Sequence, residues 1–451
     1  MDPNYAWPPL GQPWTDLPES TRTAMVAAGA EAWQQIFYGC ASYNKQWRLA
    51  RPPALTADAF RELNEVCDRI VQLIFEACQR RARTAGELRR KLGVPEGETR
   101  LLDEDEVLHD GLLAAYRPDV LFSGGVPCIV EYNIDSSLGG GFDADTVIHR
   151  YADLYREQGL LEAMPVRPAP SLLDQRFVAI RDTLGLADGA RVALLLDFLA
   201  DYPGLETPDD FLRILSPLAD RARNFGIDLI IAPVEKCTLT DDKRLVVGGA
   251  PVDALFRLFV PNRVTPSSGL DAVADALAAG TLPMYVSSAA WLLSNKLNYA
   301  WLWDDLDLLS ETDQALIRRY VPHTVALTAD QLDRALAEQA DLVAKPAGGS
   351  AGHGVLIGRE MSAVAWEDGV RAAIDAGGNI LQRYHEADQV AMDFVQIETG
   401  ETVSAVVPYS LAPYLFGRTG SGALARVGYP GCEQVLNLAR GVLMTGILLT
   451  D

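Results

Sequence analysis

The segment RPDVLFSGGVPCIVEYN (117–133) constrains the fold most. It contains two short β-rich runs separated by a Gly-Gly-Val-Pro step, which predicts a β-hairpin. Glu131 and Asn133 are two residues apart on one strand, so their side chains point to the same face, and Asp119 on the neighbouring strand could reach that face too. Three oxygen donors of this kind suit Mg²⁺, which takes its other ligands from water and phosphate. The alternative is that these are ordinary polar side chains on the solvent-facing side of a strand.

A lysine followed by a glycine-rich loop forms a second motif, LVAKPAGGSAGHGVLIG (342–358). Lys345 ends an apolar strand, where its ammonium could meet nucleotide phosphates as a point charge. The glycines allow backbone N–H groups to turn toward phosphate oxygens. The loop is not of the GxxxxGK[ST] type, because its lysine precedes the glycines. The alternative is a flexible hairpin, in which His353 is incidental. The candidate nucleotide contacts in the loop are Gly348, Gly349, Ser350, Gly352 and Gly354.

Three further stretches offer candidate nucleotide contacts. ILQRYHE (380–386) resembles a strand that runs into a hinge, whose backbone N–H and C=O groups could read an adenine edge. Lys296 lies early on a predicted helix and offers a second cation, unless it is an ordinary surface lysine. Arg418 and Arg426 could stabilise charge on a transferring phosphoryl group, unless they form surface or structural ion pairs. The residues of the hinge are Gln382, Arg383 and Tyr384.

The charge balance argues against polyanionic partners. The chain has 39 Lys and Arg against 61 Asp and Glu, and 39 − 61 = −22, so we expect neither nucleic acid nor a membrane as a partner. The six cysteines are scattered without zinc-site spacing, which indicates reduced thiols. The N-terminus lacks the features of a signal peptide, and no apolar run reaches about 18 residues, so we expect a cytoplasmic protein.

A helical region is expected at the N-terminus. At 451 residues, the chain is long enough for two or three domains. Apolar residues recur at three- and four-residue steps over 58–79, which predicts an amphipathic helix, and we expect residues 1–116 to be helical. Residues 117–165 then form the metal-binding part, and a Pro-rich linker is expected at 164–171.

The middle of the chain predicts an α/β unit. Strand, helix and strand alternate over 191–234, which indicates a Rossmann-like parallel sheet within 166–285. The GxGxxG turn of dinucleotide-binding proteins is missing. RLVVGGAPVDALFRLF (244–259) has the pattern of a Gly-Gly hairpin. Residues 286–451 would hold the nucleotide-binding subdomains.

These motifs resemble the circularly permuted branch of the ATP-grasp superfamily, which includes the synthetase domain of glutathionylspermidine synthetase. In that branch the Glu-x-Asn strand precedes the lysine loop, as it does here. The strand that closes the family's pre-ATP-grasp domain is similar to 252–259, which contains Arg257. The matching residues are Arg117, Asp119, Glu131, Tyr132 and Asn133, then Ser294, Asn295 and Lys296, then Lys345, Pro346 and Gly348 to Gly354.

The resemblance implies an α/β (α+β) fold: a circularly permuted ATP-grasp fold with a Rossmann-like pre-ATP-grasp domain and an N-terminal helical region. It implies an ADP-forming ligase that joins a carboxylate to an amine through an acylphosphate. ATP and Mg²⁺ would be required, with the metal on Asp119, Glu131 and Asn133. The catalytic cations would be Arg426, preferred over Arg418, together with Arg117, Lys296 and Lys345. Ser136 and Ser137 would hold the acyl substrate.

The sequence departs from the polyamine enzyme in two ways. It has no recognisable amidase domain, and IDSSLGGGFDAD after Asn133 differs from that enzyme's segment. Spermidine and glutathione are therefore not implied as substrates, and an amino acid or small peptide is the expected kind of small-molecule partner. The sequence leaves the oligomeric state open. Two alternatives remain: a kinase-like enzyme that stops at phosphoryl transfer, and a non-catalytic nucleotide-binding protein.

Overall fold

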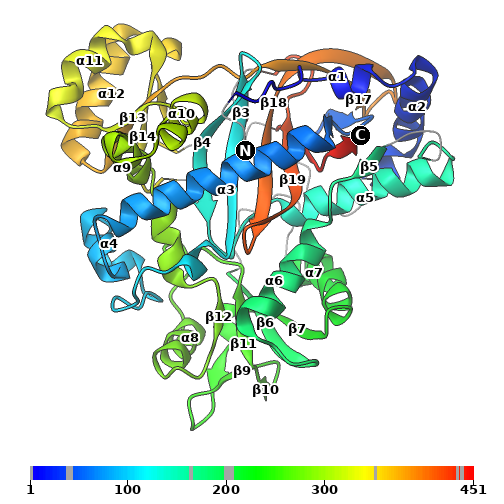
Figure 1. The fold of residues 1–451 in the computed structure, drawn as a ribbon. Helices are drawn as coiled ribbons and strands as arrows, with labels where there is room; N and C mark the ends of the chain where they lie inside the picture. Colours follow the sequence, from blue (N-terminus) through cyan, green and yellow to red (C-terminus); the bar gives the residue numbers. More distant parts are fainter. Residues whose placement is uncertain are drawn as a thin grey trace.

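The computed structural model describes residues 4–36, 44–161, 166–197, 208–349, 353–432, 436 and 441–451. An antiparallel sheet with strand order β1-β17-β18-β19-β20 lies at its centre, and the predicted hairpin, β3–β4, joins this sheet where β3 pairs with β18 (Figure 1). The strands are β1 (Trp47–Leu49), β3 (Ala115–Ser123), β4 (Val126–Ile134), β17 (Gln389–Gln396), β18 (Thr402–Phe416), β19 (Thr419–Val427) and β20 (Leu443–Thr445).

A long helix, α3 (Ala57–Gln79), crosses one face of this sheet (Figure 1). Thr56 begins it, since its side chain accepts the N–H of Ala59 at 3.1 Å. The helix predicted over 58–79 is confirmed, and its apolar stripe is buried. Two tyrosines of the hairpin fix which face meets α3. The hydroxyl of Tyr116 donates to Asp68 at 2.6 Å, and that of Tyr132 donates to the Cys67 carbonyl at 2.6 Å. The neighbouring residues along each strand therefore face away from α3.

The region expected to be helical also contains two short strands that the sequence analysis did not predict. Strand β1 pairs with β17, and β2 (Ala54–Thr56) runs parallel to β21 (Leu448–Thr450). The other edge of β21 pairs with β5 (Val166–Pro168), so part of the expected linker at 164–171 is a strand; residues 164 and 165 lie outside the described residues. Strands of three residues carry too little alternation to be recognised, and their partners lie hundreds of residues away. The helices of this region are α1 (Gln12–Thr15), α2 (Glu19–Ile36), α3 and α4 (Ala85–Lys91).

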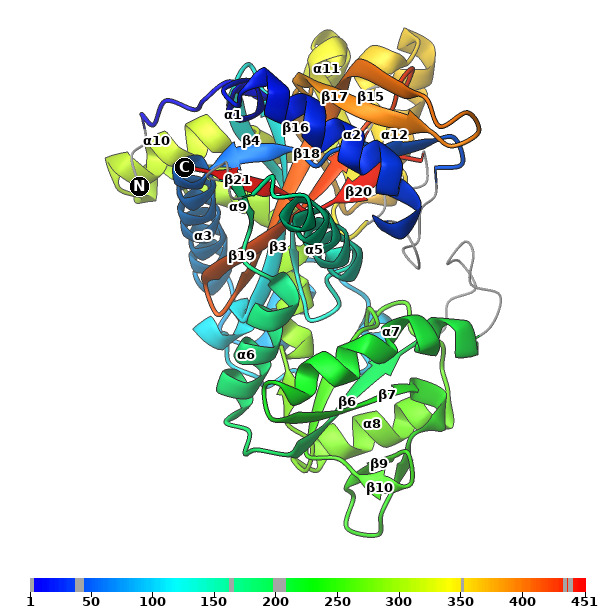
Figure 2. The same cartoon turned by 90° about the vertical axis from the view of Figure 1, so that its right-hand side faces the viewer.

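The expected α/β unit is present and lies below the central sheet in Figure 2. Its parallel strands have the order β12-β11-β6-β7. The hairpin predicted over 244–259 is shorter than expected, because β9 and β10 turn at Gly248 and Gly249 while β11 belongs to the parallel sheet. The elements are α6 (Leu172–Leu184), β6 (Ala190–Leu196), α7 (Pro208–Arg223), β7 (Ile227–Pro233), β9 (Leu245–Val247), β10 (Ala250–Pro251), β11 (Ala254–Arg257), α8 (Ser268–Ala278) and β12 (Met284–Tyr285).

A smaller antiparallel sheet carries the lysine motif. Its order is β13-β16-β14-β15, and β14 and β15 form the predicted strand–loop–strand unit. The carboxylate of Asp388 ties the chain leaving this sheet to the hairpin turn, since it accepts the N–H groups of Gly124 at 2.8 Å and Gly125 at 2.7 Å. The elements are α9 (Leu297–Asp304), α10 (Glu311–Tyr320), β13 (Thr324–Ala326), α11 (Leu332–Ala337), β14 (Leu342–Pro346), β15 (Leu356–Ile357), α12 (Ala363–Ala376) and β16 (Asn379–Arg383).

The cysteines agree with the expectation of reduced thiols. Cys67, Cys78, Cys128 and Cys237 are free and buried, and Cys432 is free and partly buried, whereas Cys40 lies outside the described residues. Within the described part of the chain, none of the helices combines the length and apolar character needed to cross a membrane.

Candidate nucleotide and metal site

A β-bulge in the hairpin decides which side chains share a face. From the turn, Ser123 pairs with Val126, and the register continues to Val120 opposite Ile129. It then shifts by one residue, so that Asp119 lies opposite Glu131 and Val130 has no partner across the pair. Directly opposite residues point to the same face. The shift therefore brings Asp119, Glu131 and Asn133 onto the face that points away from α3.

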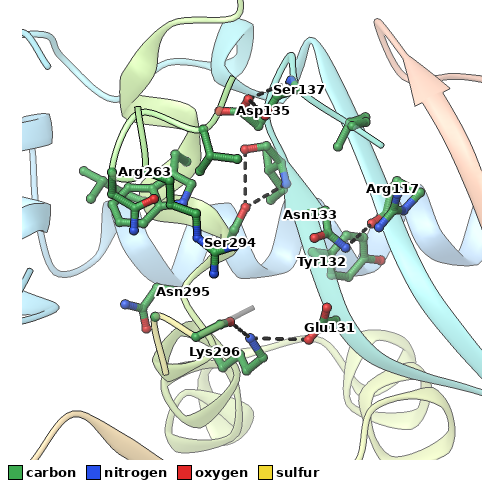
Figure 3. Close-up of a pocket in the computed structure, with 18 of the residues that line it drawn as sticks. Arg117, Glu131, Tyr132, Asn133, Asp135, Ser137, Arg263, Ser294, Asn295 and Lys296 are labelled. Carbon is green, nitrogen blue, oxygen red and sulfur yellow. Dashed lines mark hydrogen bonds and ion pairs between the residues drawn. The ribbon is translucent and has the colours of Figure 1, made fainter. Parts of the chain in front are cut away.

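Three cations surround the two carboxylates, and Figure 3 shows two of them, Arg117 and Lys296, together with Glu131. The guanidinium of Arg426, on β19, donates from Nη1 to Asp119 Oδ2 at 2.9 Å. Arg117 Nε lies 3.4 Å from Asp119 Oδ1. Lys296 Nζ lies 3.3 Å from Glu131 Oε2. The structure therefore gathers residues from three distant parts of the chain: the β3–β4 hairpin, the start of α9 and β19.

Asp119 is held in its charged form. Burial removes water and by itself raises the pKa of this carboxyl, but Arg426 and Arg117 outweigh that effect, and the pKa is lowered overall. Its Oδ1 atom is buried and accepts no hydrogen bond from the described residues. A charged, buried oxygen without a hydrogen-bond donor is suited to a cation.

The predicted donor set fits a magnesium ion. Asn133 Nδ2 donates to the Arg117 carbonyl at 3.3 Å, which leaves the amide oxygen pointing toward the cavity (Figure 3). Glu131 and Asp119 supply carboxylate oxygens on the same face. Among the described residues, no three His, Cys, Asp or Glu side chains gather as a metal-binding group, so the third protein ligand would be this amide. Two carboxylates and an amide, completed by water and phosphate, match the preference of Mg²⁺.

The Ser-Asn-Lys motif lies at the junction between the 3₁₀-helix Ser288–Ser294 and α9. Ser294 Oγ accepts the Ile134 N–H at 2.7 Å and lies 3.3 Å from the Ile134 carbonyl, so it covers the open edge of β4. Asn295 Oδ1 accepts the N–H of Leu297 at 2.9 Å. Lys296 is 7% exposed, which excludes the alternative of a surface lysine. The motif therefore fixes Lys296 beside Glu131.

The glycine-rich loop meets this lysine directly. The Lys296 N–H donates to the Ala347 carbonyl at 2.9 Å, and Lys296 Nζ donates to the Gly349 carbonyl at 2.6 Å. Gly354, with φ at +72°, packs against Pro346, where an added Cβ would come within 2.9 Å of Pro346 Cγ. Ser350 and Gly352 lie outside the described residues.

Lys345 lies on β14 beside the same charges. Desolvation lowers the pKa of its ammonium to about 8; the nearby Glu131 carboxylate opposes this shift and the Lys296 ammonium adds to it. No carboxylate of the described residues lies within ion-pair distance of its Nζ. A partly buried ammonium without a counter-ion is a favourable position for an anionic ligand.

A cavity of about 120 Å³ opens beside these charges. The β4 strand, the loop 135–139 and the loop 260–263 line it together with Lys296. Gly348 and Gly349 of the glycine-rich loop also line it. Trp291 and Leu138 add apolar surface to its lining. The cavity therefore combines charged and apolar groups.

The two predicted substrate serines differ. Ser137 lines the cavity and donates from Oγ to Asp135 at 2.6 Å. Ser136 is buried and donates to the Arg257 carbonyl at 2.7 Å, so its hydroxyl is used inside the protein and the substrate-binding prediction for Ser136 is wrong. In this loop the side chains alternate between the cavity and the interior, and the sequence does not show which serine faces which side.

A buried ion pair behind this loop was not predicted as part of the site. Arg257 Nη2 lies 2.7 Å from Asp135 Oδ2, and Nη1 lies 3.0 Å from Oδ1. The Arg257 side chain is fully buried, and Asp135 also accepts the N–H of Ser137 at 2.7 Å. An arginine inside the apolar run VDALFRLF was the available signal, since a buried charge needs a partner.

Sequence comparison finds no matching family model. No curated protein matches the chain either. A solved structure does: a glutathione synthetase-like effector from Globodera pallida matches with a TM-score of 0.55 at 11% identity, over 94% of this chain and 94% of that chain. The chain has an ATP-grasp-like fold.

Other solved structures are similar at lower scores. A protein described as a gamma-glutamylcysteine synthetase from Methylobacillus flagellatus KT has a TM-score of 0.45 at 12% identity, over 90% of each chain. D-alanyl-alanine synthetase A from Vibrio cholerae O1 biovar eltor has a TM-score of 0.26 at 13% identity, over 50% of this chain and 68% of that chain.

Arg418 is not part of the charged cluster. It lies in the turn between β18 and β19, where its guanidinium binds Asp68 of α3 at 3.0 and 3.1 Å. Asp68 is on the opposite side of the sheet from Asp119, because Tyr116 contacts Asp68 and Arg117 points the other way. The catalytic prediction for Arg418 is therefore wrong, and its alternative, an ion pair with a structural role, is what the structure shows.

The predicted hinge donors are already used within the ATP-grasp-like fold. The N–H groups of Arg383 and Tyr384 donate to the carbonyls of His323 at 2.9 Å and Asp341 at 2.7 Å. Gln382 is buried in the small sheet and donates from Nε2 to Thr324 Oγ1 at 3.0 Å. The N–H groups of Arg383 and Tyr384 are therefore not free to read an adenine edge, whereas the prediction that the C=O groups of this segment do so stays a prediction.

Proposed function

We propose that this protein is an ATP-dependent ligase that joins a small carboxylate to an amine, forming an amide and releasing ADP and phosphate. The observation that carries the proposal is the charge of the site. Arg117, Arg426, Lys296 and Lys345 contribute +4, and Asp119 and Glu131 contribute −2, so 4 − 2 = +2 within a chain of −22. A local positive charge beside a metal-type donor set suits a polyphosphate.

Each residue of the cluster has a defined role in this proposal. Lys345 and Lys296 bind phosphate oxygens, and Arg426 and Arg117 stabilise charge on the transferring phosphoryl group. A magnesium ion would be held by Asp119, Glu131 and Asn133, and it would supply positive charge that offsets the charge of the phosphates. Ser137 contacts the acyl substrate in the cavity, where an acylphosphate forms before the amine attacks. Alignment of carboxylate and γ-phosphate supplies much of the remaining acceleration.

The order of the elements supports the permuted form of the fold. The hairpin β3–β4, which carries Glu131 and Asn133, precedes the β13–β16 segment that carries Lys345. We assign the parallel-sheet unit within 166–285 to the pre-ATP-grasp domain. The segment 117–165 and the segment 286–451 together form the ligand-binding core, and residues 1–116 complete its sheet and cover one face.

The test is ADP release from Mg·ATP in the presence of pools of amino acids, small acids and amines, followed by mass analysis of the products. The expected product is lighter than its two precursors by one water. ADP together with a phosphorylated acid, whether or not an amine is present, would instead establish a kinase. Failure of the protein to bind ATP would contradict both the ligase and the kinase hypotheses.

Lys345 gives a pH prediction for nucleotide binding. Its free-state pKa is about 8, and a bound phosphate favours the charged ammonium and raises that pKa. Below this pKa the lysine is charged before ADP binds, so the affinity for ADP does not change with pH. As the pH rises through 8, the affinity for ADP should fall by at most about tenfold per pH unit. Calorimetric titration with ADP checks this.

The matched control for this effect is Lys345→Arg. A guanidinium stays charged throughout this range, so the variant should show a level affinity. A wild-type protein with no slope between about pH 7.5 and 9.5 would contradict the phosphate role of Lys345.

A further inference from the structure

A tight turn of the α/β unit, residues 260–263, forms one wall of the cavity. The N–H of Arg263 closes the turn by donating to the Val260 carbonyl at 3.0 Å. Pro261 occupies the second position, which proline favours in turns of this kind. Figure 3 shows Arg263 on the side of the cavity opposite the strand that carries Glu131. The turn therefore faces the charged cluster across the cavity.

The buried ion pair between Asp135 and Arg257 holds this turn in place. Arg257 Nη1 donates to the carbonyl of Phe259, directly before the turn, at 2.5 Å. Asp135 accepts the N–H and the hydroxyl of Ser137 at 2.7 and 2.6 Å. One ion pair therefore links the turn to the loop 135–139, and both line the same cavity.

Two hydrogen-bond acceptors on these walls are available to a ligand. Asn262 lines the cavity, and its buried Oδ1 accepts no hydrogen bond from the described residues. The hydroxyl of Ser137 donates its proton to Asp135, so its oxygen can still accept. A buried acceptor that lacks a donor is unfavourable. A ligand ammonium carries three N–H donors and can bind both oxygens.

Arg263 gives the same wall a positive charge. The charge of Asp135 (−1) is balanced by Arg257 (+1), and Arg263 adds +1, so 2 − 1 = +1. A guanidinium has five N–H donors, so it can bind a ligand carboxylate while it keeps a protein partner. The wall thus offers acceptors for an ammonium and a cation for a carboxylate. Together they complement the head group of an α-amino acid.

We propose that the turn 260–263 recognises the acid substrate, and that this acid is a short dicarboxylic α-amino acid. Asn262 and Ser137 bind its ammonium, and Arg263 binds its α-carboxylate. Its side-chain carboxylate then extends across the cavity to the charged cluster and is the group that reacts. This inference rests on the proposed function, because it takes the reaction to be ATP-dependent ligation.

The reaction then follows from which carboxylate reaches the cluster. An oxygen of the side-chain carboxylate forms a bond to the γ-phosphorus of ATP as the bond between this phosphorus and ADP breaks. The amine substrate displaces phosphate from the acyl carbon and loses a proton to water. The ammonium and α-carboxylate of the acid stay unchanged, because the turn holds them on the opposite wall.

The test compares matched acids in the assay for ADP release, with hydroxylamine as the amine, so that an acylphosphate is trapped as a hydroxamate. The probes are L-glutamate and L-aspartate; glutarate and succinate, which lack the ammonium; and γ-aminobutyrate and β-alanine, which lack the α-carboxylate. For at least one amino acid, kcat/KM should be at least about tenfold higher than for both of its analogues. Equal values for amino acids and analogues would overturn the proposal.

Arg263→Gln supplies a readout that a general loss of activity would not give. It should raise the KM for the amino acid by about tenfold, leave the KM for the analogue without the α-carboxylate unchanged, and change kcat by less than about twofold. Asn262→Ala should likewise remove the preference over the acids that lack the ammonium. An Arg263→Gln variant that raises both KM values equally, or that lowers only kcat, would contradict the assignment.

Arg244→Gln is the matched control for these variants. Arg244 lies on the same α/β unit, where its Nη2 is 3.3 Å from Asp253 Oδ1 and both side chains are exposed. It does not line the cavity, so the variant should change neither KM.

The two failures can be told apart. If none of the acids, including the pools, supports ADP release, the proposed function fails. If other acids support ADP release and amide formation but L-glutamate and L-aspartate do not, the ligase proposal stands and the assignment of the turn 260–263 fails.

Discussion

Replacing Glu131 with glutamine is expected to lower the rate of ADP release by about 10²–10³-fold while leaving the fold intact. The glutamine keeps the shape of the side chain but removes a metal-ligating charge. It also leaves Lys296 without its carboxylate partner and raises the local charge from +2 to +3. Glu131 is 26% exposed, so the neutral amide can be hydrated and little folding free energy is lost.

Measurement of turnover together with the thermal midpoint of unfolding checks this prediction. The matched control is Glu157→Gln, at the exposed end of α5 (Gly141–Glu157), which should change neither quantity. Full ATP-dependent activity in Glu131→Gln would remove Glu131 from the metal site. If Glu131→Gln loses activity because part of it unfolds, the nucleotide affinity of the fraction that stays folded is measured in place of turnover.

The largest effect on stability is expected at the buried ion pair. Asp135→Ala should lower the free energy of unfolding by about 3–5 kcal/mol, because the Arg257 guanidinium stays fully buried without a counter-ion. The substitution also removes the acceptor of the Ser137 N–H and hydroxyl. Denaturant unfolding of the variant and the wild type measures the difference.

An exposed pair provides the control for this prediction. Glu367 binds Arg371 on α12 with both side chains about half exposed, and Glu367→Ala should change stability by less than about 1 kcal/mol. A double variant, Asp135→Asn with Arg257→Met, should be less destabilised than the sum of its single variants. An Asp135→Ala variant as stable as the Glu367→Ala variant would show that Arg257 is neutralised in some other way.

The sequence predicted the hairpin but not its register. A hairpin closed directly on Gly124 and Gly125 would place Val130 opposite Asp119, and Glu131 would then face α3 with Tyr116. The bulge at Val130 corrects this by one residue. A bulge depends on tertiary packing around the strand and leaves no clear mark in the residue composition. The sequence alone therefore could not establish that Asp119 and Glu131 lie on the same face of the hairpin.

Long-range pairing limited the other predictions. Arg418 and Arg426 lie eight residues apart in one β-rich stretch, and which of them meets Asp119 depends on the strand pairing of β18 with β3. Likewise, ILQRYHE has the pattern of a strand that runs into a hinge, but β13 and β14 flank this strand on both sides and its last paired residue is Arg383. Local patterns identified the strands; their neighbours decided which groups remained available for a ligand.

The loop 135–139 has a consequence for the thermodynamics of ligand binding. The Gly139 carbonyl accepts from Arg117 at 2.6 Å and from Tyr414 at 2.5 Å, and the Leu138 carbonyl accepts from Arg176 at 3.4 Å. Fixing the backbone of one residue costs about 1–2 kcal/mol of conformational entropy. In the loop 135–139 the backbone is already fixed when the chain has folded, before any ligand binds. A small ligand with few contacts can therefore bind against this wall without having to order it. Contact with such a wall can distinguish ligands that differ by a single methylene group by about 10–200-fold.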